Sequence, residues 1–72
     1  MNAIHTPADY RQRMIDRLKK DLQTARNYLK TCREYINQAM REQDEETAYF
    51  WANQQDTALQ QVEVIRHQLK CY

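Results

Sequence analysis

Apolar residues recur along this chain with the alternating three- and four-residue spacing of a helix that buries one stripe. The first stretch has eight such positions: Ile15, Leu18, Leu22, Ala25, Leu29, Cys32, Ile36 and Ala39. No helix breaker interrupts it, because the chain has no Gly and its single Pro is at position 7. The pattern predicts one helix over residues 7–42, with Thr6 as N-cap and Pro7 at the first helical position.

A second stretch repeats the spacing, with one polar member: Ala48, Trp51, Gln55, Ala58, Val62, Ile65, Leu69 and Tyr72. It is offset by five residues from a continuation of the first stretch, whereas continuous coiled coils accommodate insertions of three or four. We therefore expect a turn at residues 43–44 and a second helix over residues 45–71, with Asp44 as N-cap. The turn lacks a Gly for a left-handed C-cap, so one continuous helix in a longer coiled coil is the alternative.

Folding the chain at this turn brings the two apolar seams together layer by layer. Ile36 then faces Trp51, Cys32 faces Gln55, and large residues mostly face small ones, as interdigitating layers require. The expected fold is all-α, an antiparallel two-helix hairpin in a single domain, with residues 1–5 as a flexible tail. Since a two-helix hairpin has no third layer, we also expect association into a larger helical bundle.

Several large apolar residues lie outside the seam and would stay exposed on the hairpin. Uncovered apolar groups of this kind predict a surface for a partner, and aromatic residues are favoured anchors at such surfaces. The partner is expected to be another helical protein, a second copy of this chain, or both. The candidate partner-binding residues are Met14, Tyr28, Tyr35, Met40, Tyr49, Phe50, Leu59 and Val64.

The charge is nearly balanced overall but uneven along the chain. The net charge is +1, yet residues 1–37 carry 8 Lys/Arg against 4 Asp/Glu. A possible basic face consists of Arg13, Arg17, Lys19, Lys20, Arg26 and Arg33. A dimeric helical nucleic-acid-binding regulator is therefore an alternative function. Against it, Asp9, Asp16 and Asp21 interrupt the basic face, and the pI near 7.8 is low for such domains.

Candidate chemistry is sparse. The chain has no Ser and no Gly-rich loop, and it offers no recognisable nucleophile and base, so we expect a non-enzymatic protein without a cofactor. His67 and Cys71 lie four residues apart on one helical face, but two ligands do not make a structural metal site. Two cysteines form no disulfide framework, and no apolar run could span a membrane. These features predict a cytoplasmic protein without membrane contact.

The second half of the chain also resembles a known family. Asp44, Tyr49, Trp51, Gln54-Gln55, Ala58-Leu59, Val62 and Ile65 form a pattern similar to that of the small co-chaperones of type III secretion needle subunits. The similarity covers roughly residues 40–69. Those proteins are helical hairpins that pair with a second, repeat-type helical chaperone and hold the needle subunit unpolymerised in the cytoplasm. The resemblance implies that this chain does the same, docking through its exposed apolar residues.

These observations together predict a protein-interaction module, a chaperone-like subunit that shields a helical partner by burying its apolar face. A small phage- or plasmid-encoded inhibitor that binds one host protein is an alternative of the same class. The nucleic-acid-binding dimer is the alternative from another class.

Overall fold

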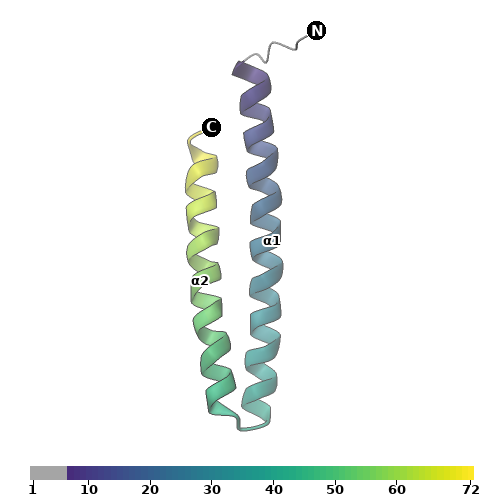
Figure 1. Cartoon of the computed structure of the whole chain (residues 1–72), viewed down its shortest axis with the longest axis vertical. Helices are drawn as coiled ribbons and strands as arrows, with labels where there is room; N and C mark the ends of the chain where they lie inside the picture. Colours follow the sequence, from purple (N-terminus) through teal and green to yellow (C-terminus); the bar gives the residue numbers. More distant parts are fainter. Residues whose placement is uncertain (1–6) are drawn as a thin grey trace.

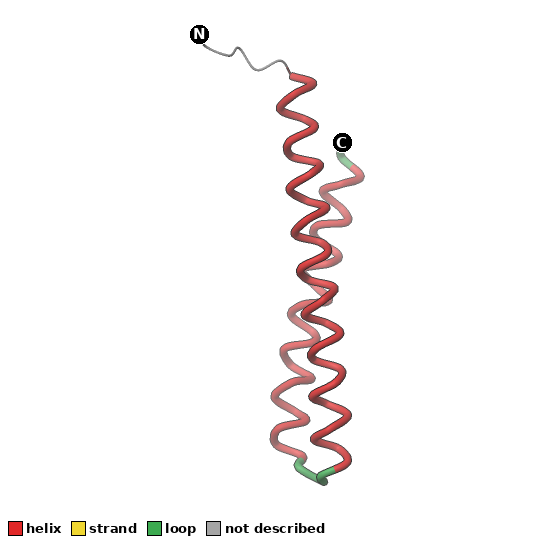
Figure 2. The backbone as a smooth tube through the Cα atoms, turned by 90° about the vertical axis from the view of Figure 1, so that its right-hand side faces the viewer, coloured by secondary structure: helices red, strands yellow, loops and turns green. Residues whose placement is uncertain are grey.

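The computed structural model describes residues 7–72 and contains two α-helices, α1 (Pro7–Arg41) and α2 (Glu45–Lys70). They run antiparallel and side by side from a tight turn, as Figures 1 and 2 show. Residues 7–72 contain no strand, so the predicted all-α hairpin is confirmed. The expected N-cap at Thr6 and the expected flexible tail over residues 1–5 lie outside the described residues.

The turn ends α1 without a glycine. Gln43 adopts φ 58°, the left-handed conformation that glycine usually supplies. Its N–H donates to the Met40 carbonyl at 3.1 Å, and the Asp44 N–H donates to the Ala39 carbonyl at 2.8 Å. This pair of bonds is a Schellman motif, which occupies the last carbonyls of the helix. The chain therefore turns back at a non-glycine residue, and α1 ends at Arg41, one residue before the predicted end.

Asp44 caps the start of α2, as the sequence predicted. Its carboxylate accepts a hydrogen bond from the Thr47 N–H at 3.2 Å and a second from the Thr47 hydroxyl at 2.7 Å. Both bonds favour the ionised carboxylate, first the one from the hydroxyl and then the one from the backbone, and they lower the pKa of Asp44. Glu45 and Glu46 follow in the first turn, where the helix dipole favours negative charge.

The core is a single thin seam between the two helices. Ala25, Leu29, Ala58 and Val62 form its centre, and Leu22 packs against them. All five residues are predicted seam positions. The buried residues of both helices are Leu18, Ala25, Leu29, Cys32, Ala39, Ala58 and Val62. Of the sixteen predicted seam positions, all but Tyr72 are buried or half-buried; Tyr72 lies beyond the end of α2 and is exposed.

The molecule is elongated, and much of its surface stays exposed. Its radius of gyration is 17.5 Å, against about 11 Å for a compact domain of 72 residues. The first turns of α1 extend beyond the end of α2 (Figure 1). The accessible surface is 6036 Å², whereas a compact monomer of 8.8 kDa exposes about 4,800 Å². The intramolecular seam therefore leaves both flanks of the hairpin open.

Candidate functional site

One flank of the hairpin carries uncharged and aromatic side chains from both helices. On each helix they recur with three- and four-residue spacing, so they form a second stripe beside the buried seam. We call this surface the tyrosine flank and define it as Thr24, Tyr28, Thr31 and Tyr35 of α1 with Phe50, Gln54, Thr57, Gln61 and Val64 of α2.

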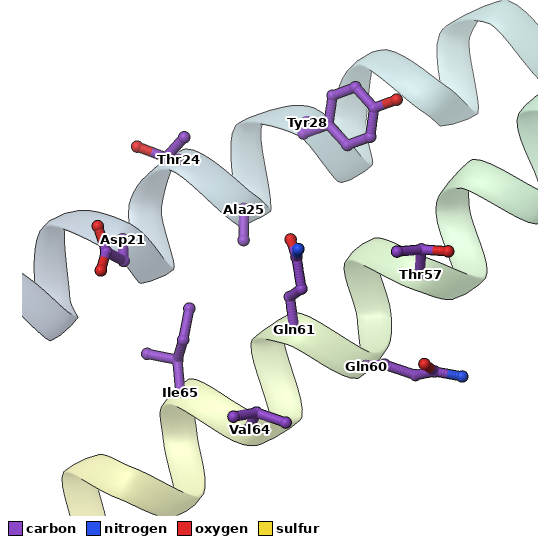
Figure 3. Close-up of a pocket in the computed structure, with 9 residues that line it drawn as sticks. All are labelled: Asp21, Thr24, Ala25, Tyr28, Thr57, Gln60, Gln61, Val64 and Ile65. Carbon is purple, nitrogen blue, oxygen red and sulfur yellow. The ribbon is translucent and has the colours of Figure 1, made fainter.

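An open groove runs between the helices on this flank, in the half of the hairpin away from the turn. Ala25, Gln61 and Ile65 point toward one another across it, while Gln60 points away (Figure 3). Tyr28 stands at the end of the groove nearer the turn. The residues that line the groove are Asp21, Thr24, Ala25, Tyr28, Thr57, Gln60, Gln61, Val64 and Ile65.

An aromatic cluster occupies the same flank in the half nearer the turn. The rings of Tyr35 and Trp51 stack with centroids 4.6 Å apart and planes 17° from parallel. Phe50 meets the same indole edge to face, with centroids 5.2 Å apart. The sequence placed Trp51 in the core beneath the turn, and the structure leaves it half-buried under Tyr35. The cluster thus extends from the half-buried Trp51 in the seam to the exposed rings of Tyr35 and Phe50.

Tyr28 links the two helices between the groove and the aromatic cluster. Its phenol donates a hydrogen bond to the Gln54 side-chain carbonyl at 3.3 Å, although the tyrosine is 40% exposed. Partial desolvation raises the pKa of Tyr28, and the nearby Cys32 thiol raises it further. The phenol therefore stays a neutral donor to higher pH than an isolated tyrosine. Cys32 is completely buried in the seam, as predicted for a small apolar residue.

The nine residues of the tyrosine flank carry no formal charge, although 29% of the chain is charged and Asp21 lines the end of the groove away from the turn. Tyrosine and phenylalanine are enriched at the centres of protein–protein interfaces, and charged residues are depleted there. Threonine and glutamine add groups that can both donate and accept hydrogen bonds. The aromatic residues of this surface and the absence of charge among its nine residues are typical of an interface centre.

The opposite flank has a different character. Lys19, Arg26 and Arg33 are exposed along α1, as expected for a basic face. Arg66 of α2 lies 3.7 Å from Glu63 in an exposed ion pair, and Asp56 is exposed two helical turns before Glu63. Such alternation of charge is typical of a solvated helix face.

The remaining candidates for partner binding are spread over other parts of the surface. Tyr49 is 72% exposed, and Met40 and Leu59 are also exposed, all three outside the tyrosine flank. Met14 is half-buried on α1. The structure thus brings Tyr28, Tyr35, Phe50 and Val64 together on one surface. Met14 lies further along the same side of α1, and Tyr49, Met40 and Leu59 lie apart from this surface.

Sequence reasoning missed part of this surface. It named Phe50 and Val64 as exposed residues outside the seam, and the structure adds that Phe50 contacts Trp51 and that Val64 lines the groove. It overlooked Thr24 and Thr57, which line the groove with Tyr28. Their spacing from Tyr28 and Gln54 was the available signal, because residues three and four positions apart share a helix face.

Residues 7–72 give little support for a metal site or a membrane-spanning helix. No group of three or more His, Cys, Asp or Glu side chains in this range is placed to hold a metal ion. The Cys71 thiol donates to the His67 carbonyl at 3.5 Å. Neither of the two described helices is long and apolar enough to cross a membrane.

Comparison with known proteins adds no relative. No family model matches the chain, and no curated protein or solved structure is significantly similar to it.

Proposed function

We propose that this chain is a non-enzymatic protein-interaction module that docks an α-helix of a protein partner on its tyrosine flank. The observation that carries the proposal is an uncharged, aromatic stripe that spans both helices of a highly charged hairpin. A two-helix seam cannot cover this stripe, because the hairpin has no third layer.

The docked helix would lie along the hairpin and complete a helical bundle. Helices that pack in grooves use apolar residues at i, i+3, i+4 and i+7 as anchors. The groove beside Ala25 and Val64 offers space for such anchors, and the Tyr35–Trp51 stack offers a flat apolar surface. The threonine and glutamine side chains along the stripe supply hydrogen-bonding groups for the polar edges of the helix.

A chaperone-like role follows from this mode of binding. A partner whose amphipathic helix is covered on this flank could not use that apolar face to polymerise. The resemblance to the co-chaperones of type III secretion needle subunits points to the same role, and a needle subunit or its second chaperone would then be the partner. A phage- or plasmid-encoded inhibitor would use the same surface on a host protein.

Affinity capture from the native cell tests the proposal. Wild-type protein is expected to recover a helical protein, and Tyr28→Asp is expected to lose it, because a carboxylate would be buried against the docked helix. Asn37→Asp introduces the same side chain at an exposed position on the other side of α1 and should retain the partner.

Equal recovery with Tyr28→Asp and Asn37→Asp would reject the tyrosine flank as the docking surface. Circular dichroism of both variants establishes that each is still helical. Recovery of nucleic acid that is lost as salt concentration rises would instead support the basic face, because phosphate contacts are steeply salt-dependent.

A further inference from the structure

We infer that the tyrosine flank also binds a second copy of this chain about a two-fold axis that passes beside Thr57. The turn of each copy then lies next to the end of the other copy that is farthest from its turn. The inference rests on the proposal that this flank docks helices, and it names one occupant. In such a dimer α1 packs antiparallel on α1 of the second copy, and α2 packs antiparallel on α2. The order of side chains along each stripe favours this arrangement.

The stripe on α1 is complementary to itself when reversed. If the axis lies between Tyr28 and Thr31, Tyr28 of one copy faces Thr31 of the other copy. In the same way, Tyr35 of one copy faces Thr24 of the other. Each bulky ring therefore meets a small side chain, which is how antiparallel layers interdigitate. At the edges of the interface Arg17 of one copy faces Glu42 of the other, a pair of opposite charges.

The stripe on α2 reads nearly the same in both directions. Apolar, Gln, Thr, Gln and apolar side chains follow one another at Phe50, Gln54, Thr57, Gln61 and Val64. Reversal about Thr57 places Phe50 over Val64 and Gln54 over Gln61. The two amides can then donate to and accept from each other across the interface.

The shape of the flank agrees with this register. The aromatic cluster of Tyr35, Phe50 and Trp51 lies on one side of the Thr57 level, and the groove lined by Val64 lies on the other. A two-fold axis at that level brings the cluster of each copy over the groove of the other. An interface across such an axis must be self-complementary. Here the aromatic cluster of each copy would fit into the groove of the other.

The hairpin exposes more surface than a compact monomer of its mass would. The chain exposes 6036 Å², which exceeds the surface of a compact monomer of its mass by about 1,200 Å². A standard stable interface takes about 800 Å² from each partner. The uncharged stripe also places no like charges opposite one another along the centre of the interface.

Light scattering and disulfide trapping test the inference on the full chain. The expected molar mass is twice 8.8 kDa, and Phe50→Asp is expected to halve it. In a Cys71→Ser background, Thr57→Cys should form a disulfide-linked dimer under mild oxidation, because the two cysteines would meet at the axis. Asp56→Cys is the matched control, and it should stay unlinked because Asp56 is exposed at the same level of α2 but lies on the opposite, charged flank.

A monomeric mass at every concentration tested would overturn the inference, as would a dimer in which Asp56→Cys links as readily as Thr57→Cys. If the chain is monomeric and Tyr28→Asp still loses a captured helical protein, the second copy is rejected and the proposed function stands. If Thr57→Cys links and no captured protein depends on Tyr28, the inference stands and the proposed function is rejected.

Discussion

Two neighbouring residues at the turn decide that the chain is a hairpin rather than one long helix. Gln43 holds a left-handed backbone conformation, and Asp44 caps the helix that follows. The cap could be predicted, because Asp before an acidic first turn is a strong N-terminal signal. The left-handed residue could not, because glutamine has no preference for this conformation. Two Schellman hydrogen bonds stabilise it there.

Replacing Gln43 with glycine should therefore stabilise the protein. A left-handed conformation costs a residue with a Cβ atom roughly 1–2 kcal/mol, and glycine avoids most of that cost. We expect Gln43→Gly to raise the free energy of unfolding by about 1 kcal/mol. Urea denaturation followed by circular dichroism, at one fixed protein concentration, measures the difference.

The same substitution within a helix provides the control. Gln60→Gly, at an exposed position in the middle of α2, should lower the free energy of unfolding by about 0.5 kcal/mol, because glycine is a poor helix former. If Gln43→Gly is destabilising as well, the left-handed turn at Gln43 is wrong.

Acid should weaken the capped turn. Because the Thr47 hydroxyl and N–H favour the carboxylate, the pKa of Asp44 lies below its ordinary value of 3.8 in the folded chain. Its contribution to stability is complete above the unfolded-state pKa and is lost as the pH falls through the lower native-state pKa. Asp44→Asn keeps an acceptor oxygen but does not titrate.

Unfolding titrations at neutral and acidic pH measure this effect. The wild type should lose more of its free energy of unfolding on acidification than Asp44→Asn does. An equal loss in the two proteins would contradict the assigned role of the Thr47 hydrogen bonds.

At the scale of the helices, the buried seam could be predicted from the sequence, whereas the flank beside it could not. Apolar spacing predicts which stripe of a helix is buried, and Leu29, Ala58 and Val62 are buried as expected. Threonine and glutamine give no such signal, since both are common on solvated helices. The aromatic cluster also depends on how the helices pair, because Tyr35 reaches Trp51 only across the hairpin.

The Tyr35–Trp51 stack should couple α1 to α2 energetically. Stacked aromatic pairs contribute about 0.5–1.5 kcal/mol beyond the area they bury. A double-mutant cycle with Tyr35→Ala and Trp51→Ala is expected to give a coupling free energy in this range, measured by chemical denaturation. The same cycle with Tyr28→Ala and Trp51→Ala should be close to additive. Trp51 stacks on Tyr35, and Tyr28 lies two helical turns away from Tyr35 along α1. Additivity in both cycles would remove the stack as a contact that holds the helices together.

At the scale of the whole molecule, the hairpin is long and thin, and both flanks of its seam are open. Its core consists of a single seam in which Ala25, Ala39 and Ala58 are among the buried residues. Small helical proteins with such limited cores are commonly stabilised by association. The hairpin shape followed from the two heptad patterns and their offset. The identity of the partner that covers the flank could not be predicted, because the apolar pattern describes only contacts within this chain.

The central claim is that the tyrosine flank is covered by another helix when the protein works. Site-specific photo-crosslinking in the native cell tests this most directly, with p-benzoylphenylalanine replacing Tyr28 in one strain and exposed Lys30 in another. The account predicts a discrete adduct from position 28 and none from position 30, which faces away from the flank. An adduct of twice the chain mass identifies the second copy, and a different discrete mass identifies another protein. Adducts from position 30 but not from position 28 would contradict the account.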